Sequence, residues 1–324
     1  MPPETAGARA CVVAVLQSLG PQYIKEIEAV DPRVRVLRVR DRATWHDEAP
    51  EAEVILGFRP LRDGATRSRA LKWVHQGGAG VENLTADVAG TEIIVTNTHI
   101  HGETIAEHVL ALTLAHTRRL RELFEYQQRR AWGHGELRAV RLLAGSTMGV
   151  LGLGTIGRAV ARRAAAFGMR VWGTRRHVGP PPDGVERVFP PEALDDVLRV
   201  ADVLAVTLPL TPETRGLLGA RELALLPRGA FVVNIGRGQL IDEPALIQAL
   251  RQGHLGGAGL DVFVEEPLPA TSPVWTLPTV IVSPHVSGGF PGYTDHMVAL
   301  FCDNLRRYLA GQPLRNVVNT ALGY

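Results

Sequence analysis

Residues 148–167 read MGVLGLGTIGRAVARRAAAF, and the fold prediction starts from this stretch. An apolar run leads into Gly152, Gly154 and Gly157, which have G-x-G-x-x-G spacing, and a helical pattern follows them. A strand, a tight turn and a helix in this order aim backbone N–H groups at a pyrophosphate bound at the helix N-terminus. The stretch therefore predicts a dinucleotide site, although a glycine-rich turn that binds nothing has the same spacing.

Each glycine has its own expected task in such a turn. We expect Gly152 to form the tight turn, Gly154 to let the backbone approach the cofactor, and Gly157 to pack the helix against the strand. Thr155 and Ile156, which open the helix, complete the predicted cofactor-binding loop.

The next apolar run, 170–173, is followed by Thr174, Arg175 and Arg176. In dinucleotide-binding folds, the residues at this turn contact the adenosine ribose. An NAD site usually carries Asp or Glu at this turn, and this sequence has neither. Guanidinium groups can bind a 2′-phosphate with paired hydrogen bonds, whereas a carboxylate would repel it. The turn therefore predicts NADP as cofactor, with NADPH preferred and NAD possible, unless both arginines are simply solvated charges.

Short apolar runs alternate with amphipathic ones along the chain. We expect strands at 11–16, 34–39, 53–58, 72–75, 93–96, 148–153, 170–173, 203–208, 231–235, 259–262 and 280–282, and helices at 23–30, 103–130, 156–167, 192–200, 244–250 and 293–309. Strands that alternate with helices form parallel sheets, which predicts an α/β protein with a doubly wound sheet after residue 147. The last helix can return to the first domain and make that domain discontinuous.

Length and composition limit the possible classes. A chain of 324 residues exceeds the about 250–300 residues at which single cores stop growing, so we expect two domains. A net charge of +2 gives no reason to expect nucleic acid or a membrane surface as partner. Cys11 and Cys302 have neither disulfide nor metal-ligand spacing, and the sequence shows no signal peptide or apolar run long enough to span a membrane. These features predict a folded cytoplasmic protein.

The helical pattern 103–130 carries an apolar stripe made of Ile105, Val109, Leu112, Leu120 and Leu123. A single small domain cannot bury a stripe of this length. We therefore expect one long helix at a subunit interface, and a homodimer.

Several motifs downstream of the glycine turn occur in a recognisable order. They are NIGRG at 234–238, GLDVF at 259–263, EEPLP at 265–269 and SPHVSG at 283–288, with looser matches in GGAGV at 77–81 and IAEHVL at 105–110. Over nearly its whole length the chain resembles the D-isomer-specific 2-hydroxyacid dehydrogenases. The resemblance implies a discontinuous, flavodoxin-like substrate domain (1–98 and 288–324). It also implies a central Rossmann-like domain (99–287) that includes a dimer-arm helix, with the active site between the two domains.

The chemistry of 2-keto acid reduction can be matched to residue types. It requires a cation for the carboxylate, a proton donor at the ketone oxygen and a hydride source. Arg237 can bind a carboxylate bidentately, and His285, just after a strand, can deliver the proton. The resemblance makes Glu266 the partner of His285 and brings Asp261 to the nicotinamide end. Taken singly, each of these residues is more readily explained as a surface charge or a structural group. Taken together, in the order that the family shows, they favour the catalytic assignment.

Further residues complete the predicted site. Backbone N–H groups of Gly78, Ala79 and Gly80 are expected to hold the substrate carboxylate. Cofactor contacts are also expected from Leu208, Pro209 and Ile235. The loop residues Phe58 and Arg59 are expected to face the variable end of the substrate.

A metal site is the alternative for one histidine-rich segment. His99, His101, Glu103, Glu107 and His108 are possible zinc ligands, but they lack H-E-x-x-H spacing, and we predict no metal. Trp132 is expected either to pack after the long helix or, as in hydroxypyruvate reductases, to close the partner's pocket.

Two functions of different classes fit these residues. The first is an NADPH-dependent reductase of small 2-keto acids, with glyoxylate and hydroxypyruvate as leading substrates. The second is a dinucleotide-sensing binding protein similar to the corepressors that reuse this fold and keep the same Arg, Glu and His. Such proteins usually carry an acid at the ribose position, where this chain has Arg175, so we favour the enzyme.

Overall fold

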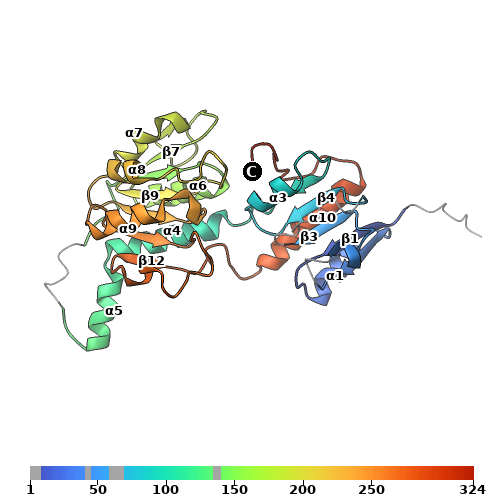
Figure 1. Ribbon diagram of the computed structural model, residues 1–324, viewed down its shortest axis with the longest axis horizontal. Coiled ribbons are helices and arrows are strands. Elements are labelled where there is room, and N and C mark those ends of the chain that lie inside the picture. The colour runs from blue at the N-terminus through green and yellow to red at the C-terminus, as the bar shows by residue number, and fades with distance from the viewer. Residues whose placement is uncertain (1–8, 41–44, 58–68, 134–139) are drawn as a thin grey trace, which may run out of the picture. The chain divides into compact units, whose positions relative to one another are not determined.

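The computed structural model describes residues 9–40, 45–57, 69–133 and 140–324. The chain divides into two compact units (Figure 1). Unit 1 contains residues 1–100 and 290–324, and unit 2 contains residues 101–289. Each unit is built around one parallel sheet, so the predicted α/β class with two parallel sheets is confirmed.

Unit 1 has a five-stranded sheet in the order β2-β1-β3-β4-β5, the flavodoxin-like order. Its strands are β1 (Cys11–Val15), β2 (Val34–Arg38), β3 (Val54–Gly57), β4 (Trp73–Gln76) and β5 (Ile94–Thr96). Its helices are α1 (Pro21–Glu28), α2 (Trp45–Glu48), α3 (Glu82–Asp87) and α10 (Tyr293–Leu309). Helix α10 comes from the far end of the chain and buries Phe301 against Trp73 of the sheet, with ring centroids 5.2 Å apart. The unit is therefore discontinuous in sequence.

Unit 2 has a seven-stranded parallel sheet in the order β12-β11-β10-β9-β6-β7-β8. Its strands are β6 (Thr147–Leu151), β7 (Arg170–Thr174), β8 (Arg187–Phe189), β9 (Val203–Val206), β10 (Phe231–Asn234), β11 (Gly257–Leu260) and β12 (Val280–Val282). Its helices are α4 (Gly102–Thr117), α5 (Leu120–Arg129), α6 (Thr155–Ala166), α7 (Leu194–Leu198), α8 (Ala220–Leu225) and α9 (Glu243–Arg251). The strand order reverses between β6 and β9, and in such sheets ligands bind at the carboxyl ends beside this point.

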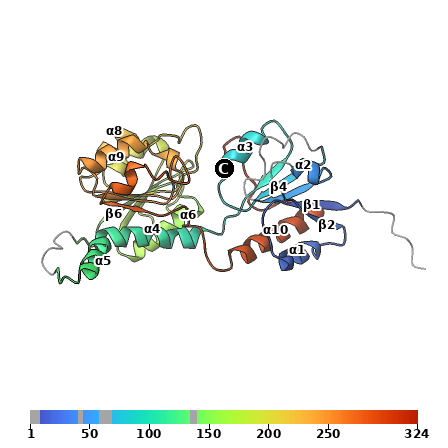
Figure 2. The ribbon, with the colours of Figure 1, turned by 60° about the horizontal axis from the view of Figure 1, so that its bottom comes forward.

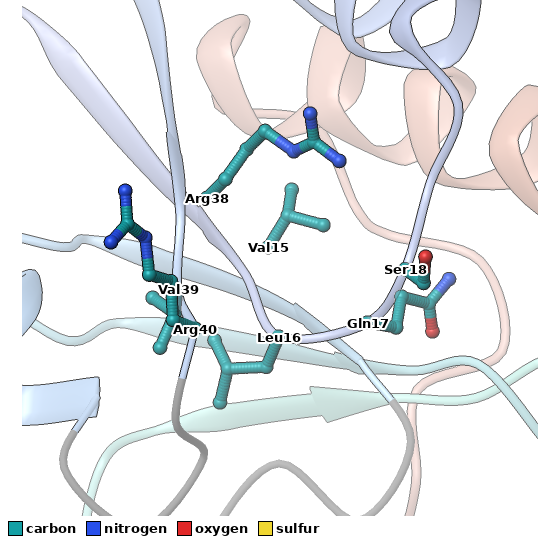
Figure 3. A pocket seen from close by; sticks show the side chains of 7 residues that line it. All are labelled: Val15, Leu16, Gln17, Ser18, Arg38, Val39 and Arg40. Carbon is teal, nitrogen blue, oxygen red and sulfur yellow. The ribbon is translucent and has the colours of Figure 1, made fainter.

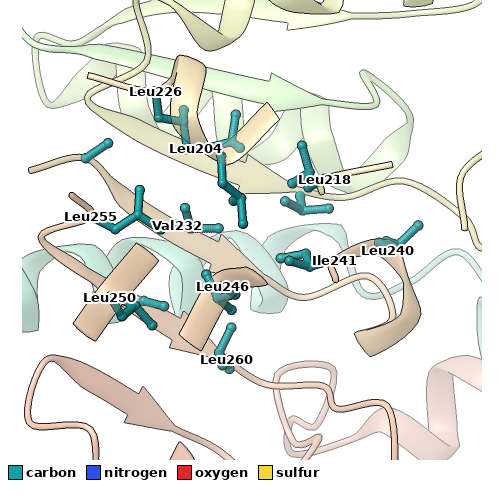
Figure 4. Close-up of a cluster of buried hydrophobic side chains, with 14 of the residues drawn as sticks. Leu204, Leu218, Leu226, Val232, Leu240, Ile241, Leu246, Leu250, Leu255 and Leu260 are labelled. Carbon is teal, nitrogen blue, oxygen red and sulfur yellow. The ribbon is translucent and has the colours of Figure 1, made fainter. Parts of the chain in front are cut away.

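Two hydrophobic clusters cover the faces of the seven-stranded sheet. One joins α7, α8 and α9 to the sheet through residues such as Leu204, Val232 and Leu246 (Figure 4). The other packs α4 and α6 on the opposite face, where Val109 and Val160 are fully buried. Burial on both faces explains why these strands read as nearly continuous apolar runs.

The prediction of one long helix over 103–130 is wrong. Helix α4 ends at Thr117 and α5 begins at Leu120, because Arg119 adopts the left-handed conformation with φ 58°, which a right-handed helix cannot contain. Figure 2 shows α4 lying along the sheet and α5 turning away from its end. Most apolar residues of α4 are buried, whereas α5 has no buried residue.

Several short elements were not expected from the sequence. They are β8, α2, α3 and α8, which have between three and six residues each. Among the residues that the structure describes, none of the helices is long and apolar enough to span a bilayer.

Candidate active site

The glycine turn joins β6 to α6 at the carboxyl end of the sheet. Gly152 has φ 96°, a conformation that residues with a Cβ rarely adopt. At Gly157 an added Cβ would lie 2.1 Å from the carbonyl oxygen of Gly152, so only glycine allows the helix to approach the turn this closely. The Thr207 hydroxyl lies 2.7 Å from the same carbonyl oxygen and bonds the turn to the residue after β9.

Gly154 differs from the other two glycines. An added Cβ would meet nothing within 4 Å, so the backbone here borders open space. Gly154 is also the N-cap of α6, and no side chain caps this helix. The exposed N–H groups at the start of α6 and the missing Cβ are what a pyrophosphate requires. The residues present therefore fit a dinucleotide.

The carboxyl end of β7 supplies the turn that we assign to the ribose. Thr174 is buried, and its hydroxyl accepts a 3.2 Å hydrogen bond from the Gly152 N–H, which holds the glycine turn against β7. Arg175 and Arg176 are exposed. The pKa of Glu213 is lowered, chiefly by a hydrogen bond from Thr211 and also by the positive charge of Arg176.

The other predicted cofactor residues lie along the same edge of unit 2. Thr155 and Ile156 form the first turn of α6, and Leu208 and Pro209 follow β9. Ile235 follows β10 and is buried in the cluster that includes α4 and α6.

His285 and Glu266 form a hydrogen-bonded pair. Nδ1 of His285 lies 2.7 Å from Oε2 of Glu266, and the other carboxylate oxygen accepts from the Phe263 N–H at 2.9 Å. The His285 side chain is 41% exposed, so its ring can be reached from solvent. A carboxylate on Nδ1 fixes the orientation of the ring and leaves Nε2 as the nitrogen that faces a substrate.

Arg237 lies three residues after the end of β10 and precedes a short 3-10 turn over Gly238–Leu240. Asn234, the last residue of β10, holds the segment that leads to Arg237. Its side-chain amide donates to the Arg237 carbonyl oxygen at 2.9 Å, and its side-chain oxygen accepts from the Gly236 N–H at 3.1 Å. The guanidinium is half-buried, and one of its N–H groups donates to the Gly236 carbonyl oxygen at 2.6 Å. Arg237 and His285 thus follow strands whose carboxyl ends share one edge of the sheet.

Asp261, directly after β11, is fully buried. It accepts hydrogen bonds from the N–H groups of Val286 and Ser287 at 3.0 Å and from the Ser283 hydroxyl at 2.5 Å. All three donors belong to the loop that carries His285. The carboxylate therefore organises this loop, and its contact with a nicotinamide remains a prediction.

The loop after β4 contains the predicted substrate-binding residues of unit 1. Its carbonyl oxygens are all engaged: Gly78 accepts from the Thr98 N–H, Ala79 from the Asn97 amide and Gly80 from the Gln76 amide. The Tyr293 hydroxyl donates to the carbonyl oxygen of the preceding Gly77. With its carbonyls held in this way, the loop can present its N–H groups to an anion.

The histidine-rich segment has partners of its own. Glu103 pairs with Arg162 and Arg163 of α6, and His108 bonds to Ser283. In the described part of the chain, no group of three or more His, Cys, Asp or Glu side chains is arranged to hold a metal ion.

Two other predicted positions have different outcomes. Trp132 is 94% exposed, so the expectation that it packs within the chain is wrong. Phe58 and Arg59 lie outside the described residues.

One hollow of about 530 Å³ lies at the carboxyl ends of β1 and β2 in unit 1 (Figure 3). It is lined by Val15, Leu16, Gln17, Ser18, Arg38, Val39 and Arg40. None of these is a predicted site residue, so the hollow is separate from the residues assigned above.

Sequence reasoning missed three supporting residues: Thr207, Ser283 and Tyr293. Each contributes a hydroxyl that fixes a loop through long-range contacts, and a lone hydroxyl carries no sequence signal. The only hint was position, because Ser283 lies within a motif and Thr207 lies in the predicted strand at 203–208.

A doubly wound sheet whose carboxyl edge carries a G-x-G-x-x-G turn and a histidine–carboxylate pair defines a two-domain protein of the dinucleotide-binding class. Residues 110–287 match the family described as D-isomer specific 2-hydroxyacid dehydrogenase, NAD binding domain. The chain belongs to this family, and the resemblance seen in its motifs is confirmed.

Named relatives fall into two groups. The chain is 42% identical over 286 residues to glyoxylate/hydroxypyruvate reductase B of Pectobacterium atrosepticum, a match that covers 85% of this chain and 88% of the relative. It is 32% identical over 315 residues to D-3-phosphoglycerate dehydrogenase of Methanocaldococcus jannaschii, which covers 95% of this chain but only 59% of the relative. The chain thus spans little more than half the length of the phosphoglycerate dehydrogenases that it matches.

A solved structure is also similar. It is the D-isomer specific 2-hydroxyacid dehydrogenase from Xanthobacter autotrophicus Py2, in complex with NADPH and MES. The TM-score is 0.85 at 35% identity, and the match covers 98% of this chain and 100% of that chain.

Proposed function

We propose that the protein is an oxidoreductase that transfers a hydride between NADPH and a small 2-keto acid. The observation that carries the proposal is the His285–Glu266 hydrogen bond of 2.7 Å, on the sheet edge that also holds the glycine turn and Arg237. A proton donor, a carboxylate-binding cation and a dinucleotide site on one edge are what this reaction requires.

Each residue has a role in the proposed reaction. Arg237 binds the substrate carboxylate and polarises the adjacent carbonyl group. His285 donates a proton from Nε2 to the ketone oxygen, and Glu266 holds the ring through Nδ1. The N–H groups of Gly78, Ala79 and Gly80 bind the second carboxylate oxygen. NADPH, when bound, supplies the hydride.

The same proposal assigns roles to the two parts of the chain. Residues 1–98 and 288–324 form the substrate domain, and residues 99–287 bind the dinucleotide. Asp261 meets the nicotinamide end, and Leu208, Pro209 and Ile235 line the cofactor site. The open space at Gly154 supports a bound pyrophosphate.

The cofactor preference rests on the turn after β7. Its arginines are exposed, it contains no carboxylate, and the similar structure from Xanthobacter autotrophicus binds NADPH. The same absence of a ribose-binding acid argues against a dinucleotide sensor of the corepressor type, and no feature of the described residues favours that alternative.

Glyoxylate and hydroxypyruvate are the proposed substrates, on the strength of the 42% identity to a reductase named for them. A panel of 2-keto acids should be assayed with NADPH and with NADH, and both substrates should be reduced. A panel with no reduction, measured on protein that binds NADPH, would overturn the proposal and favour a sensor.

We also propose that the protein is a cytoplasmic homodimer. Phe124 of α5 is 60% exposed, and Leu120 and Leu123 of the same helix are exposed as well, which leaves apolar side chains on α5 that a second copy can bury. Cys11 and Cys302 are buried free thiols, which suits a reducing compartment. Light scattering at micromolar concentration should give twice the chain mass of 35.1 kDa, and a value near that mass would contradict the dimer.

A further inference from the structure

The loop that carries His285 has an unusual backbone. His285 has φ 54°, in the left-handed region that non-glycine residues rarely occupy. Such a conformation is strained and persists only where surrounding contacts hold it. The contacts here are the hydrogen bonds that Ser283, Val286 and Ser287 donate to Asp261. These bonds hold the loop on both sides of His285.

Asp261 is in turn linked to helix α4. Nε2 of His108 lies 2.9 Å from the Ser283 hydroxyl oxygen and 3.8 Å from Oδ1 of Asp261. The Ser283 hydroxyl has one proton, and the acceptor-only carboxylate takes it. The hydroxyl must therefore accept from His108, so Nε2 of His108 carries a proton.

We propose that His108 is a positioning residue for His285, acting through the chain His108–Ser283–Asp261. Its N–H fixes the direction of the Ser283 hydroxyl, which directs the serine proton to Asp261 and keeps the carboxylate aligned with the N–H groups of Val286 and Ser287. The inference rests on the proposed function, because it gives His108 a role in the same proton transfer. It also accounts for a histidine that neither the cofactor nor the substrate assignment uses.

The alternative is that the His108 ring only packs against the loop that follows β12. Packing would be retained by a ring of similar size, whereas positioning requires an N–H at the place of Nε2. His108→Phe keeps the ring and removes the donor, and His108→Gln places a side-chain N–H near the original position. His116 provides a matched control, because it lies two turns further along α4 and stacks on Phe231 with centroids 4.2 Å apart.

The first experiment compares steady-state kinetics of the full-length protein with glyoxylate and NADPH. His108→Phe should lower kcat about tenfold, equivalent to about 1.4 kcal/mol, and should leave the KM for NADPH within about twofold, because only the proton donor is displaced. His108→Gln should recover most of the loss, and His116→Phe should match the wild type. Equal kcat for His108→Phe and the wild type would overturn the inference.

A double-mutant cycle tests whether the three residues act as one chain. Ser283→Ala should also lower kcat, and His108→Phe combined with Ser283→Ala should be little worse than either change alone. Strictly additive losses would mean that His108 does not act through Ser283.

A measurement without cofactor or substrate keeps the two proposals separate. In the apoprotein, histidine-selective ¹⁵N NMR should find His108 protonated at Nε2, and the ring resonances of His285 should shift in His108→Phe but not in His108→Gln or His116→Phe. If wild-type protein reduces no 2-keto acid but shows these shifts, the proposed function fails and the positioning chain stands. Unmoved His285 resonances in an active protein would overturn the positioning chain alone.

Discussion

Two histidines, His75 in unit 1 and His285 in unit 2, lie at or just beyond the carboxyl ends of parallel strands but have opposite surroundings. His75 is fully buried in β4, and its ring nitrogens bond to the hydroxyls of Thr96 at 2.7 Å and Thr98 at 3.2 Å. Burial lowers the pKa of His75 to about 3. His285 is 41% exposed and bonds to the Glu266 carboxylate. Hydroxyl partners and burial give a neutral structural group, whereas a carboxylate and an open face give a group that can exchange protons.

The two sheet edges differ in the same way. In unit 2, the ionisable side chains of Arg237, Asp261 and His285 follow three neighbouring strands. In unit 1, the loop after β4 has backbone N–H groups in place of charged side chains, and side-chain amides donate hydrogen bonds to its carbonyl oxygens. One edge can carry acid–base chemistry, and the other can recognise an anion without adding a titrating group.

The largest expected effect comes from removing the proton donor. His285→Ala should lower kcat at least about a hundredfold, because positioned acid–base groups contribute roughly 10² to 10⁴. NADPH affinity, measured by fluorescence titration, should stay close to the wild-type value. A kcat near that of the wild type with an unchanged pH profile would make His285 a structural residue like His75.

The second effect concerns the cation on the same edge. Arg237→Lys should lower kcat/KM for glyoxylate about ten- to hundredfold, because an ammonium cannot reproduce the planar fork, and hydrogen bonds to charged groups are worth about 1.5–3 kcal/mol. Arg251→Lys, at the end of α9, is the matched control and should have no effect. Equal losses in both variants, or in neither, would refute the role of Arg237.

Most of the fold could be predicted from the sequence, and the failures have physical causes. The helix at 293–309 has the predicted bounds because its apolar periodicity is strong, and the strand at 280–282 has them because its three residues form an unbroken apolar run. The break at Arg119 could not be seen, since a left-handed arginine between two helical patterns has no local signal. The three-residue strand β8 was missed because it is too short to show a period.

Site residues could be predicted from the sequence where they belong to a motif. They could not be predicted where tertiary contacts alone bring them to the site. The pairing of Glu266 with His285 followed from the family resemblance, and the structure brings the two side chains together. The burial of Thr174 beneath the glycine turn depends on how β7 pairs with β6, which no local pattern reports.

The third effect tests the cofactor side of the unit 2 edge. Wild-type protein should use NADPH at least about tenfold better than NADH in kcat/KM, since a charged hydrogen bond is worth about 1.5–3 kcal/mol and 1.4 kcal/mol is about tenfold. The difference should lie in KM, because the 2′-phosphate is far from the hydride. Arg175→Asp should abolish or reverse the preference.

Salt and a control variant sharpen this test. Arg175 is exposed, so higher ionic strength should narrow the preference. Turnover by Arg175→Asp with saturating NADH should approach that of the wild type, because His285 is untouched. An unchanged cofactor ratio in Arg175→Asp would show that the arginine is a solvated charge.

The last effect concerns stability, not turnover, and returns to His75. Its pKa in the folded protein, about 3, lies below the ordinary value of 6.5, so between these pH values the unfolded chain binds a proton that the folded chain does not. The free energy of unfolding of unit 1 should therefore fall as the pH falls through this window, by at most about 1.4 kcal/mol per pH unit from this residue.

His75→Gln keeps a donor and an acceptor for Thr96 and Thr98 but cannot titrate, so the stability of unit 1 in this variant should fall less between pH 7 and pH 4.5. Urea unfolding read by hydrogen exchange mass spectrometry reports the two units separately, and equal pH slopes for wild type and variant would show that burial of His75 does not govern its protonation. His116, whose pKa burial lowers to about 4, should give unit 2 a similar dependence that His75→Gln leaves unchanged.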